Sequence, residues 1–194
     1  MHKIIINESP LTSKKAAKEI KKRIRFAKNY IEYGSGGSTL YASKYCKKVL
    51  SVESDFDFKK TIENKLNKNC KIIYSDIGET IEFGVPKSND VNTFLNPNGL
   101  DYALSPWKFK NIPDLVLIDG RYRVICLLIS LLKNKNSKCI YLFDDYFLRP
   151  YYWVVEDYVK VLKKIDNLAI FKIKNNINKT DIRKVIKIYE HDFR

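Results

Sequence analysis

Residues 29–41 read NYIEYGSGGSTLY. A short apolar strand runs into a glycine-rich turn at residues 34–38, and the chain then continues at helical spacing through Leu40 and Tyr45. Glycines are needed where a backbone turns sharply or lies against a ligand, and the first turn of the following helix exposes N–H groups that suit a phosphate, a carboxylate or a ribose oxygen. The segment therefore predicts a strand, a tight turn and a helix. An ordinary strand-to-helix turn would fit this glycine pattern as well.

The length and composition are those of one globular domain. The chain has 194 residues, of which 45% are hydrophobic and 13% aromatic. No apolar run approaches the roughly 20 residues that span a bilayer, and the start, MHKIIINESP, has too short an apolar segment for a signal peptide. We therefore expect a single domain over residues 1–194 without a membrane span. Its expected location is the cytoplasm, or the host cytoplasm if the protein is viral.

The charge of the chain leaves two interpretations open. A net charge of +14 indicates an anionic partner such as nucleic acid or a phosphorylated sugar. However, only seven of the 36 basic residues are Arg, and Lys, Ile and Asn are abundant, as AT-rich coding would produce. Within residues 1–28, a basic helix is predicted at 13–28, with Ser13 as N-cap and Ile20 and Ile24 on its apolar face. Its opposite face is either a basic arm over a substrate or an ordinary solvated face.

Apolar strands and helices alternate along the rest of the chain. Further strands are predicted at 48–53, 71–76, 113–119, 139–143, 168–173 and 185–189, and further helices at 56–67, 121–133 and 150–165. This alternation predicts an α/β fold with a seven-stranded, mostly parallel sheet and helices on both faces. No helix separates the last two strands, so a C-terminal antiparallel hairpin is expected.

One segment, residues 77–112, is about three times longer than a usual connection. It contains several glycines and prolines together with the aromatic residues Phe83, Phe94, Tyr102 and Trp107. Long aromatic loops of this kind often cover a binding site. The segment is therefore expected to act as a lid, and the alternative is an insertion without that role.

Five successive predicted strands end in acidic residues, namely Glu32, Glu53, Asp76, Asp119 and the pair Asp144 and Asp145. In an open α/β sheet, ligands bind at the carboxyl ends of the strands, near the point where the strand order reverses. Because an unpaired carboxylate is rarely buried without a function, this edge is the predicted site. The position of Glu53, about 20 residues after the glycine turn, suits the ribose hydroxyls of a nucleotide cofactor. Thr39 stands where the nicotinamide fingerprint has its third glycine, which disfavours that cofactor.

At these residues the chain resembles the class I S-adenosylmethionine-dependent methyltransferases. Their acidic-x-Gly-x-Gly motif matches residues 32–36, and their acid after the second strand matches Glu53. The resemblance covers roughly residues 29–191. The sequences EYGSGGST, VESD and DLVLIDGRYRV are similar to a branch of poorly characterised bacterial and viral methyltransferase-like proteins. The resemblance implies a Rossmann-like fold, an enzyme and S-adenosylmethionine as cofactor.

The resemblance also implies roles for single residues. The backbone at Gly34 and Gly36 would approach the methionine part of the cofactor, while Glu32 would orient that loop or the amino group. Glu53 would hold the ribose, while Asp76 and Ile77 would flank the adenine, with Asp76 bound to the adenine amino group. The expected cofactor pocket comprises Glu32, Gly34, Ser35, Gly36, Gly37, Ser38, Glu53, Ser54, Asp76, Ile77 and Asp119. Ser38 stands where many members of the family carry another glycine, which leaves the detailed shape of the loop open.

A second resemblance concerns a metal. Metal-dependent O-methyltransferases of the catechol and macrolide-sugar types carry acids at the positions of Asp119, Asp144 and Asp145. Three carboxylates suit Mg²⁺, which would lower the pKa of a substrate hydroxyl. The alternative for Asp144 and Asp145 is structural, through a turn or through pairing with Arg149 or Arg121. The expected catalytic residues are Asp119, Asp144 and Arg121.

The acceptor is the least determined part of the prediction. Histidine occurs only at His2 and His191, so deprotonation would fall to a metal, an aspartate or water. Arg121, Arg123 and Arg149 near the predicted site favour an anionic substrate or neutralise the acids beside them. We expect methylation of a small hydroxylated acceptor, anionic or sugar-linked, with Mg²⁺ as an option. The alternative is a nucleic-acid-binding protein or RNA methyltransferase on the same fold. No feature of the sequence indicates an oligomeric state.

Overall fold

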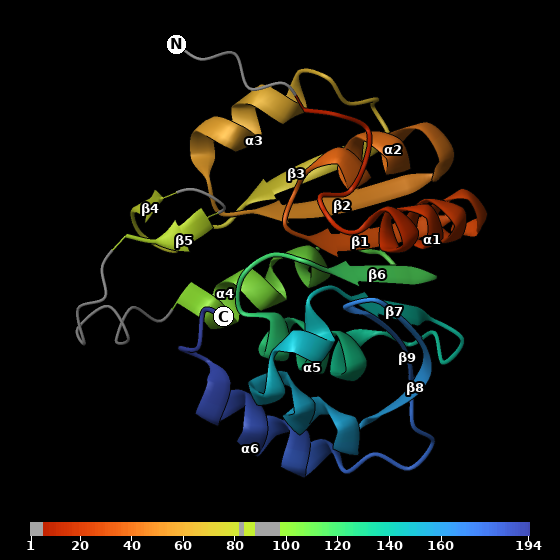
Figure 1. Cartoon of the computed structure of the whole chain (residues 1–194). Coiled ribbons are helices and arrows are strands. Elements are labelled where there is room, and N and C mark those ends of the chain that lie inside the picture. Colours follow the sequence, from red (N-terminus) through yellow and green to blue (C-terminus); the bar gives the residue numbers. More distant parts are fainter. Residues whose placement is uncertain (1–5, 82–83, 88–97) are drawn as a thin grey trace.

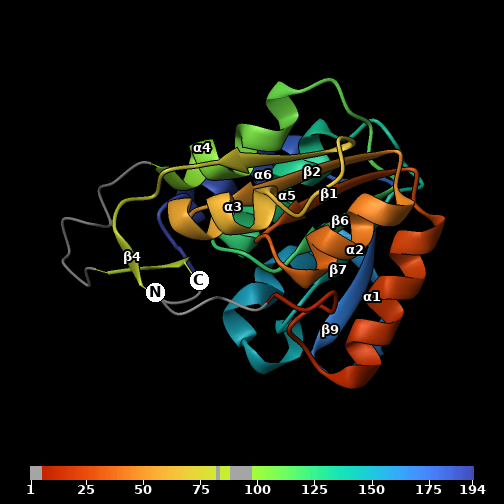
Figure 2. The ribbon, with the colours of Figure 1, turned by 90° about the horizontal axis from the view of Figure 1, so that it is seen from above.

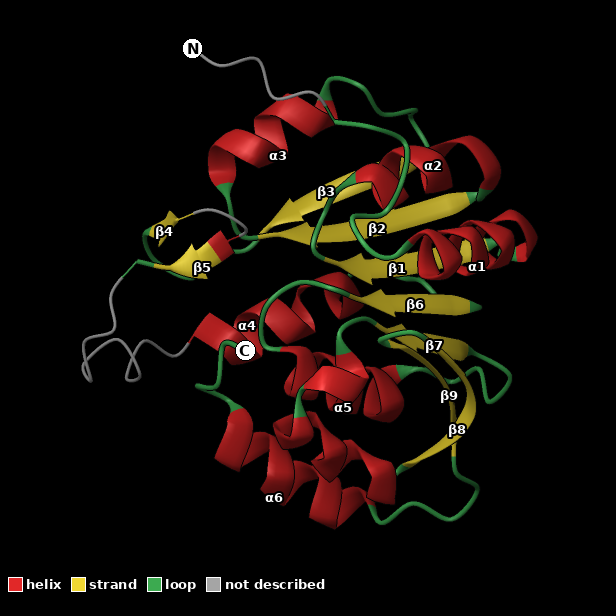
Figure 3. Ribbon diagram, in the orientation of Figure 1, coloured by secondary structure: helices red, strands yellow, loops and turns green. Residues whose placement is uncertain are grey.

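The computed structural model describes residues 6–81, 84–87 and 98–194. Its main sheet has seven strands in the order β3-β2-β1-β6-β7-β9-β8 (Figures 1 and 3). The strands are β1 (Asn29–Tyr33), β2 (Lys48–Glu53), β3 (Cys70–Tyr74), β6 (Leu115–Ile118), β7 (Ile140–Phe143), β8 (Val159–Ile165) and β9 (Leu168–Ile173). The five strands from β3 to β7 pair in parallel, whereas β9 pairs antiparallel to both β7 and β8. The expected sheet with its terminal hairpin is confirmed.

The strand order reverses between β1 and β6, which are neighbours in the sheet. The chain moves outward from β1 through β2 to β3, and it returns to pair with β1 on the other side. The helix α2 (Gly37–Tyr45) follows the glycine turn directly, as the sequence predicts. The loops after β1 and β6 therefore meet at the point of an α/β sheet where ligands bind.

Two layers of helices cover the sheet. One face carries α1 (Lys14–Phe26), α2 and α3 (Phe56–Glu63), and the other carries α4 (Asn98–Leu104), α5 (Arg123–Lys133) and α6 (Lys179–Tyr189) (Figures 1 and 2). Alternate residues of β1 divide between the layers, because Ile31 packs with the α5 core and Tyr30 packs with the α1 core. Within the described residues, no helix combines the length and hydrophobicity that crossing a bilayer requires.

The C-terminal elements differ from the prediction. Residues 150–165 form a 3-10 helix, η5 (Pro150–Asp157), and then strand β8, where a single helix was expected. The predicted strand at 185–189 is instead the end of α6. Asn178 caps α6 by accepting from the N–H groups of Thr180 and Asp181. This N-cap favours a helix over the predicted strand. An antiparallel hairpin is present, as predicted, but its strands are β8 and β9 and not the predicted pair 168–173 and 185–189. A two-residue turn at Asp166 and Asn167 joins them.

The long segment after β3 is partly a component of the core. It contains β4 (Thr80–Ile81), β5 (Val85–Pro86), α4 and the 3-10 helix η3 (Ser105–Lys108). Tyr102 is buried, and the indole N–H of Trp107 donates to the Tyr33 hydroxyl at 2.9 Å. These two aromatic residues therefore pack against the sheet. Phe83 and Phe94 lie outside the described residues, and a lid formed by the remainder of the segment stays a prediction.

Candidate functional site

Two glycines bring the loop after β1 against the loop after β6. Gly34 has a φ of 91°, and a Cβ at this position would lie 2.8 Å from the Cα of Gly120. A Cβ at Gly120 would lie 2.7 Å from the amide nitrogen of Gly34. The N–H of Asp119 donates to the carbonyl of Tyr33 at 3.0 Å. Because only glycine fits at both positions, the two loops touch where the strand order reverses.

Gly36 lies in open surroundings. Its backbone is extended, and no atom of the described residues would come within 4 Å of an added Cβ. Its N–H donates to Oγ1 of Thr39 at 2.8 Å, within the first turn of α2. Gly37 differs, because a side chain there would meet the backbone carbonyls of Asn7 and Ser9. Gly36 is therefore the glycine of this turn that faces space available to a ligand.

Glu32 is fully buried beneath the glycine turn. Its carboxylate accepts from the Tyr30 hydroxyl at 2.6 Å, from the Ser51 hydroxyl at 3.0 Å and from the hydroxyl of Thr39. Burial raises the pKa of Glu32 to about 6, although these hydroxyl donors and Ser38 favour its ionised form. Since Thr39 also accepts from Gly36, the carboxylate orients the glycine turn through one hydroxyl.

Glu53 connects the end of β2 to the same turn. One carboxylate oxygen accepts from the N–H of Ser35 at 3.0 Å, and the other accepts from Ser54 at 2.8 Å and Asp55 at 2.9 Å. Burial raises the pKa of Glu53, and these three N–H donors oppose that shift. A carboxylate has about four acceptor positions, so capacity for one further hydrogen bond remains.

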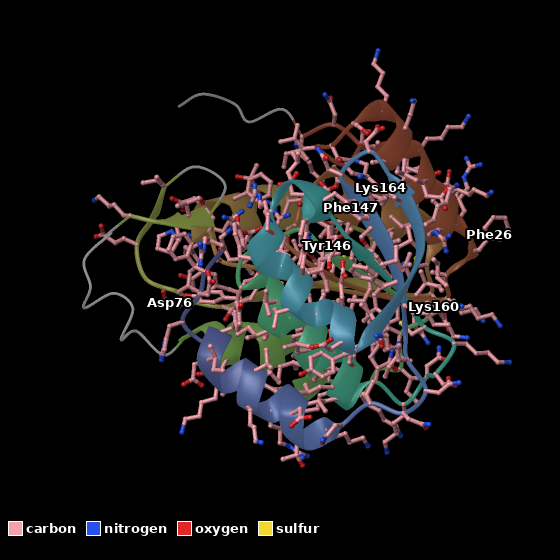
Figure 4. All side chains as sticks on the ribbon, turned by 60° about the horizontal axis from the view of Figure 1, so that its bottom comes forward. Phe26, Asp76, Tyr146, Phe147, Lys160 and Lys164 are labelled. Carbon is pink, nitrogen blue, oxygen red and sulfur yellow. The ribbon has the colours of Figure 1, made fainter. Side chains whose placement is uncertain are left out.

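The predicted adenine-binding residues after β3 have contrasting environments. The Asp76 side chain is exposed (Figure 4). One of its oxygens accepts from the Gly78 N–H at 2.9 Å. Ile77 and Ser54 are both buried, and Gly84 lies against the Ser54 hydroxyl. Of the predicted adenine-binding residues, Asp76 thus presents a polar side chain at the surface, whereas Ile77 contributes to an apolar wall.

Arg123, in the first turn of α5, organises the other half of the carboxyl edge. Its side chain is only 4% exposed, and it donates to the carbonyls of Asp144 at 2.7 Å, Gly120 at 3.0 Å and Asp119 at 3.2 Å. It also lies 3.3 Å from the carboxylate of Asp119 and 3.5 Å from that of Asp145. One guanidinium therefore holds the loops after β6 and β7 together.

The carboxyl group of Asp119 has a pKa well above its usual range. Burial raises its pKa to about 7, Arg123 opposes this shift, and the neighbouring carboxylates of Asp144 and Asp145 reinforce it. The side chain is 27% exposed and follows β6 directly. It can therefore receive a proton from a group bound at this edge.

The expected magnesium ligands are engaged in other contacts. Asp144 is buried and accepts from the Thr12 hydroxyl at 3.1 Å, while Asp145 pairs with Arg149 at 2.9 Å. In the described part of the chain, no three carboxylate, cysteine or histidine side chains are arranged to hold a metal ion. The pairing alternative thus describes Asp145, with Arg149 and Arg123 as partners where Arg121 was expected. The enclosure of Asp144 also disfavours direct contact with a substrate.

Arg121 is an incompletely satisfied cation at the same edge. Its Nε is buried, and no group within the described ranges accepts a hydrogen bond from it. Burial lowers the pKa of Arg121, and the positive charge of Arg123 lowers it further. The phenolic groups of Tyr102 and Tyr152 oppose this shift. A buried donor without a partner is costly, and an arginine that is partly exposed at this edge suits an anionic group.

The sequence indicated that Arg123 could neutralise the acids beside it, as its pairs with Asp119 and Asp145 show. Sequence reasoning missed the hydrogen bonds of Arg123 to the backbone of two loops and the role of Thr39 in the glycine turn. Arg123 lies four residues after Asp119, a spacing that allows the two side chains to meet. Thr39 lies three residues after Gly36, where a helix-capping partner stands. Both spacings can be read from the sequence. They predict these contacts only when the first residue of each helix is known.

Comparisons with known proteins place this geometry in a family. No family model and no curated protein sequence matches the chain. Among solved structures, a methyltransferase-like protein from Silicibacter pomeroyi is 30% identical, with a TM-score of 0.79 over 94% of this chain and 97% of that chain.

More distant structures share the fold alone. The tRNA methyltransferase TrmI from Aquifex aeolicus is 12% identical, with a TM-score of 0.54 over 88% of this chain and 72% of that chain. The N-methyltransferase NodS from Bradyrhizobium japonicum, solved with S-adenosylhomocysteine, is 10% identical, with a TM-score of 0.50 over 82% of this chain and 88% of that chain.

The sheet order, the glycine turn and the acid-tipped edge define the Rossmann-like methyltransferase fold. Together with the relative from Silicibacter pomeroyi, they show that the chain belongs to the class I S-adenosylmethionine-dependent methyltransferases. The expected family is thereby confirmed. The acceptor is not identified by these structures, which include a tRNA methyltransferase and an N-methyltransferase.

The residues at the β1–β2 half fit this cofactor. The open space at Gly36 allows a ligand to lie against the backbone, and the Glu53 carboxylate retains acceptor capacity for a ribose hydroxyl. Asp76 offers a second acceptor at the edge of the same half. The structure contains no feature of comparable fit for Mg²⁺ among the described acids.

Proposed function

We propose that this chain transfers the methyl group of S-adenosylmethionine to a hydroxyl oxygen of a small acceptor that carries an anionic group. The observation that supports this most directly is the contact between the glycine turn after β1 and the turn at Asp119 and Gly120 after β6. A carboxylate that titrates near neutral pH then stands next to the loop assigned to the cofactor.

The β1–β2 half would hold the cofactor. Gly36 would accommodate its methionine part, Glu53 would accept from the ribose hydroxyls, and Asp76 with Ile77 would flank the adenine. S-adenosylmethionine, when bound, supplies an electrophilic methyl group on a sulfonium centre. Glu32 acts through Thr39 to keep the glycine turn in place, so we assign it a positioning role.

The β6–β7 half would supply the base. As the acceptor oxygen attacks the methyl group, its proton passes to the carboxylate of Asp119. A base whose pKa lies near the working pH combines a large ionised fraction with useful basicity. Arg123 keeps Asp119 oriented and stabilises its ionised form. Arg123 and Arg149 pair with Asp145, and Arg123 also pairs with Asp119, so these carboxylates already have cationic partners. We therefore favour removal of the proton by Asp119 over its removal from a hydroxyl bound to magnesium.

Arg121 would recognise the anionic group of the acceptor. Its buried Nε lacks a partner in the described residues, and Arg149 lies at the same edge beside Tyr152, to whose hydroxyl it donates at 3.2 Å. A carboxylate or phosphate on the acceptor would satisfy the guanidinium of Arg121. An RNA nucleotide also carries a hydroxyl beside a phosphate, so the acceptor class includes it as the second candidate.

Cofactor binding and methyl transfer test this proposal separately. Calorimetric titration with S-adenosylhomocysteine should show binding by the unmodified protein and by Asp119→Asn. Transfer of labelled methyl groups should then be measured on a panel of sugar phosphates, hydroxylated aromatic acids and a short RNA, with and without a chelator. Transfer that survives the chelator and is lost in Asp119→Asn supports the proposal. Absence of cofactor binding, or full activity of Asp119→Asn, contradicts it.

A further inference from the structure

Helix α1 carries a net charge of +6, a large share of the net charge of +14 of the chain. This helix holds seven Lys and Arg residues and a single acid, Glu19. Glu19 is already paired with Arg23 at 2.9 Å and Lys163 at 3.7 Å. The exposed lysines of α1, namely Lys14, Lys15, Lys18 and Lys22, form no ion pair with any described residue. Their charges are therefore available to a partner.

Strand β8 extends this basic surface at the edge of the sheet. It contributes three exposed lysines, Lys160, Lys163 and Lys164, and no acid. Contacts between Lys163 and Glu19, and between the hydroxyl of Ser13 and Asp166 at 2.6 Å, place β8 beside α1. Together, α1 and β8 carry nine of the net fourteen positive charges of the chain, although they comprise only 20 of its 194 residues.

Exposed aromatic side chains stand at the end of α1. Phe26 is 82% exposed and Tyr45 is 46% exposed. The Arg25 guanidinium lies over the Tyr45 ring at 5.2 Å and donates to the Tyr41 hydroxyl at 2.7 Å. Figure 4 shows Phe26 at the edge of the molecule, with Lys160 and Lys164 in the same half of the view. The patch thus combines cations with planar rings that can stack on bases.

We propose that α1 and β8 form a binding surface for single-stranded RNA. Lysines along a rigid helix attract phosphates, and exposed rings beside them suit unpaired bases. An acidic membrane is the less suitable partner, because the apolar face of α1 packs against the sheet through Ile20 and Ile24 and cannot insert into lipid. RNA binding at this surface goes beyond the proposed methyl transfer and does not depend on it.

The N-terminal end of α1 lies near the carboxyl edge of the sheet. Residue Thr12, which immediately precedes the Ser13 N-cap of α1, contacts Asp144 at 3.1 Å. From this end, α1 runs along the face of the sheet to Phe26 over about 20 Å, at 1.5 Å per residue. A strand bound along α1 would therefore have one end near Asp144 and the other near the exposed rings.

Fluorescence anisotropy with a labelled single-stranded RNA of about 20 nucleotides would test this surface, in the absence of cofactor and at about 50 to 200 mM salt. The unmodified protein should bind with an affinity that falls as salt increases. The triple variant Lys14→Glu, Lys18→Glu, Lys22→Glu should weaken binding by about tenfold or more and flatten the salt dependence. The matched control, Lys65→Glu, Lys68→Glu, Lys187→Glu, changes the net charge equally at exposed positions elsewhere and should bind nearly as the unmodified protein does.

A second variant tests the aromatic end of the surface. Phe26→Ala leaves the charge unchanged and removes an exposed ring, so the fold should be retained and RNA affinity should fall by about fivefold or more. Circular dichroism checks that every variant is folded. If both triple variants weakened RNA binding equally, the proposal would be overturned, because binding would then depend on the total charge of the protein and not on this surface. Failure to bind RNA, combined with binding to phosphatidylserine vesicles, would overturn it in favour of a membrane. Calorimetry with S-adenosylhomocysteine separates either failure from loss of the cofactor site.

Discussion

The two halves of the carboxyl edge hold their acids in different ways. On the β1–β2 half, Glu32 accepts from hydroxyl groups and Glu53 accepts from backbone N–H groups. On the β6–β7 half, Asp119 and Asp145 instead lie against the guanidinium of Arg123. In sequence these residues look alike, because each lies at or just after the end of an apolar strand. The comparison teaches that their roles depend on the donors that the fold brings to them.

This difference has a chemical consequence. Neutral donors position the glycine turn without adding net charge, which suits a loop that must accommodate a ligand. An arginine beside several carboxylates leaves a site whose protonation changes near neutral pH, as the pKa of Asp119, about 7, indicates. We therefore assign binding to the first half and proton transfer to the second.

Asp119→Asn should have the largest effect, and it acts on the second half alone. Loss of a general base should lower turnover by about 10²- to 10⁴-fold. Because the base works in its ionised form, activity of the unmodified enzyme should rise with pH up to about 7 and then level off. That rise should be absent from the residual activity of the variant. The control is calorimetry with S-adenosylhomocysteine, which should bind to the variant as it does to the unmodified protein. Loss of this binding would show that Asp119 also belongs to the cofactor site and would contradict the separate roles of the two halves.

Arg123→Met tests whether one guanidinium organises the β6–β7 half. Removing a buried arginine that faces carboxylates should lower the free energy of unfolding by about 3–5 kcal/mol. The control is Arg149→Met, whose partly exposed pair with Asp145 should contribute only about 0–1 kcal/mol. Urea denaturation measures both. Similar losses in the two variants would show that the arginines share the role.

Gly34→Ala and Gly36→Ala separate structural from binding requirements within one turn. At Gly34, a positive φ and overlap with Gly120 should cost about 2–4 kcal/mol of stability. Gly36→Ala should leave stability unchanged, since its methyl group enters open space. Steric intrusion there should instead weaken cofactor binding by about 1–3 kcal/mol. Denaturation and calorimetry together provide the test, and tight binding by Gly36→Ala would contradict the assigned cofactor position.

Glu32→Gln should produce the smallest effect, visible as a change in pH dependence. Burial raises the pKa of Glu32 from 4.5 to about 6, so between these values the folded chain binds more protons than the unfolded chain. The contribution of Glu32 to the free energy of unfolding therefore falls by about 2 kcal/mol as the pH rises through this range, and is level above it. Glu32→Gln should remove this part of the slope in denaturation curves from pH 4 to 7. An identical slope in both proteins would show that Glu32 is ionised at lower pH.

Local patterns predicted much of the fold. The turn at residues 34–38, the apolar strands and the acids at their ends are all encoded within a few neighbouring positions. They were sufficient for the family, for a mostly parallel seven-stranded sheet and for the presence of an antiparallel hairpin, although not for one of the two strands that form it. The errors at 150–165 and 185–189 arose where apolar spacing suits either a helix or a strand, and a cap or a tight turn decided between them.

The sequence by itself determined which residues reach the carboxyl edge of the sheet, because strand ends and glycine turns depend on local chemistry. Only the tertiary structure decided which of them act together. Arg123 meets Asp145 across two loops, Thr12 meets Asp144 over 132 positions, and Gly34 meets Gly120 through strand pairing. The proton affinity of a carboxyl and the partner of an arginine are set by neighbours distant in sequence, and the packed fold alone brings those neighbours within reach.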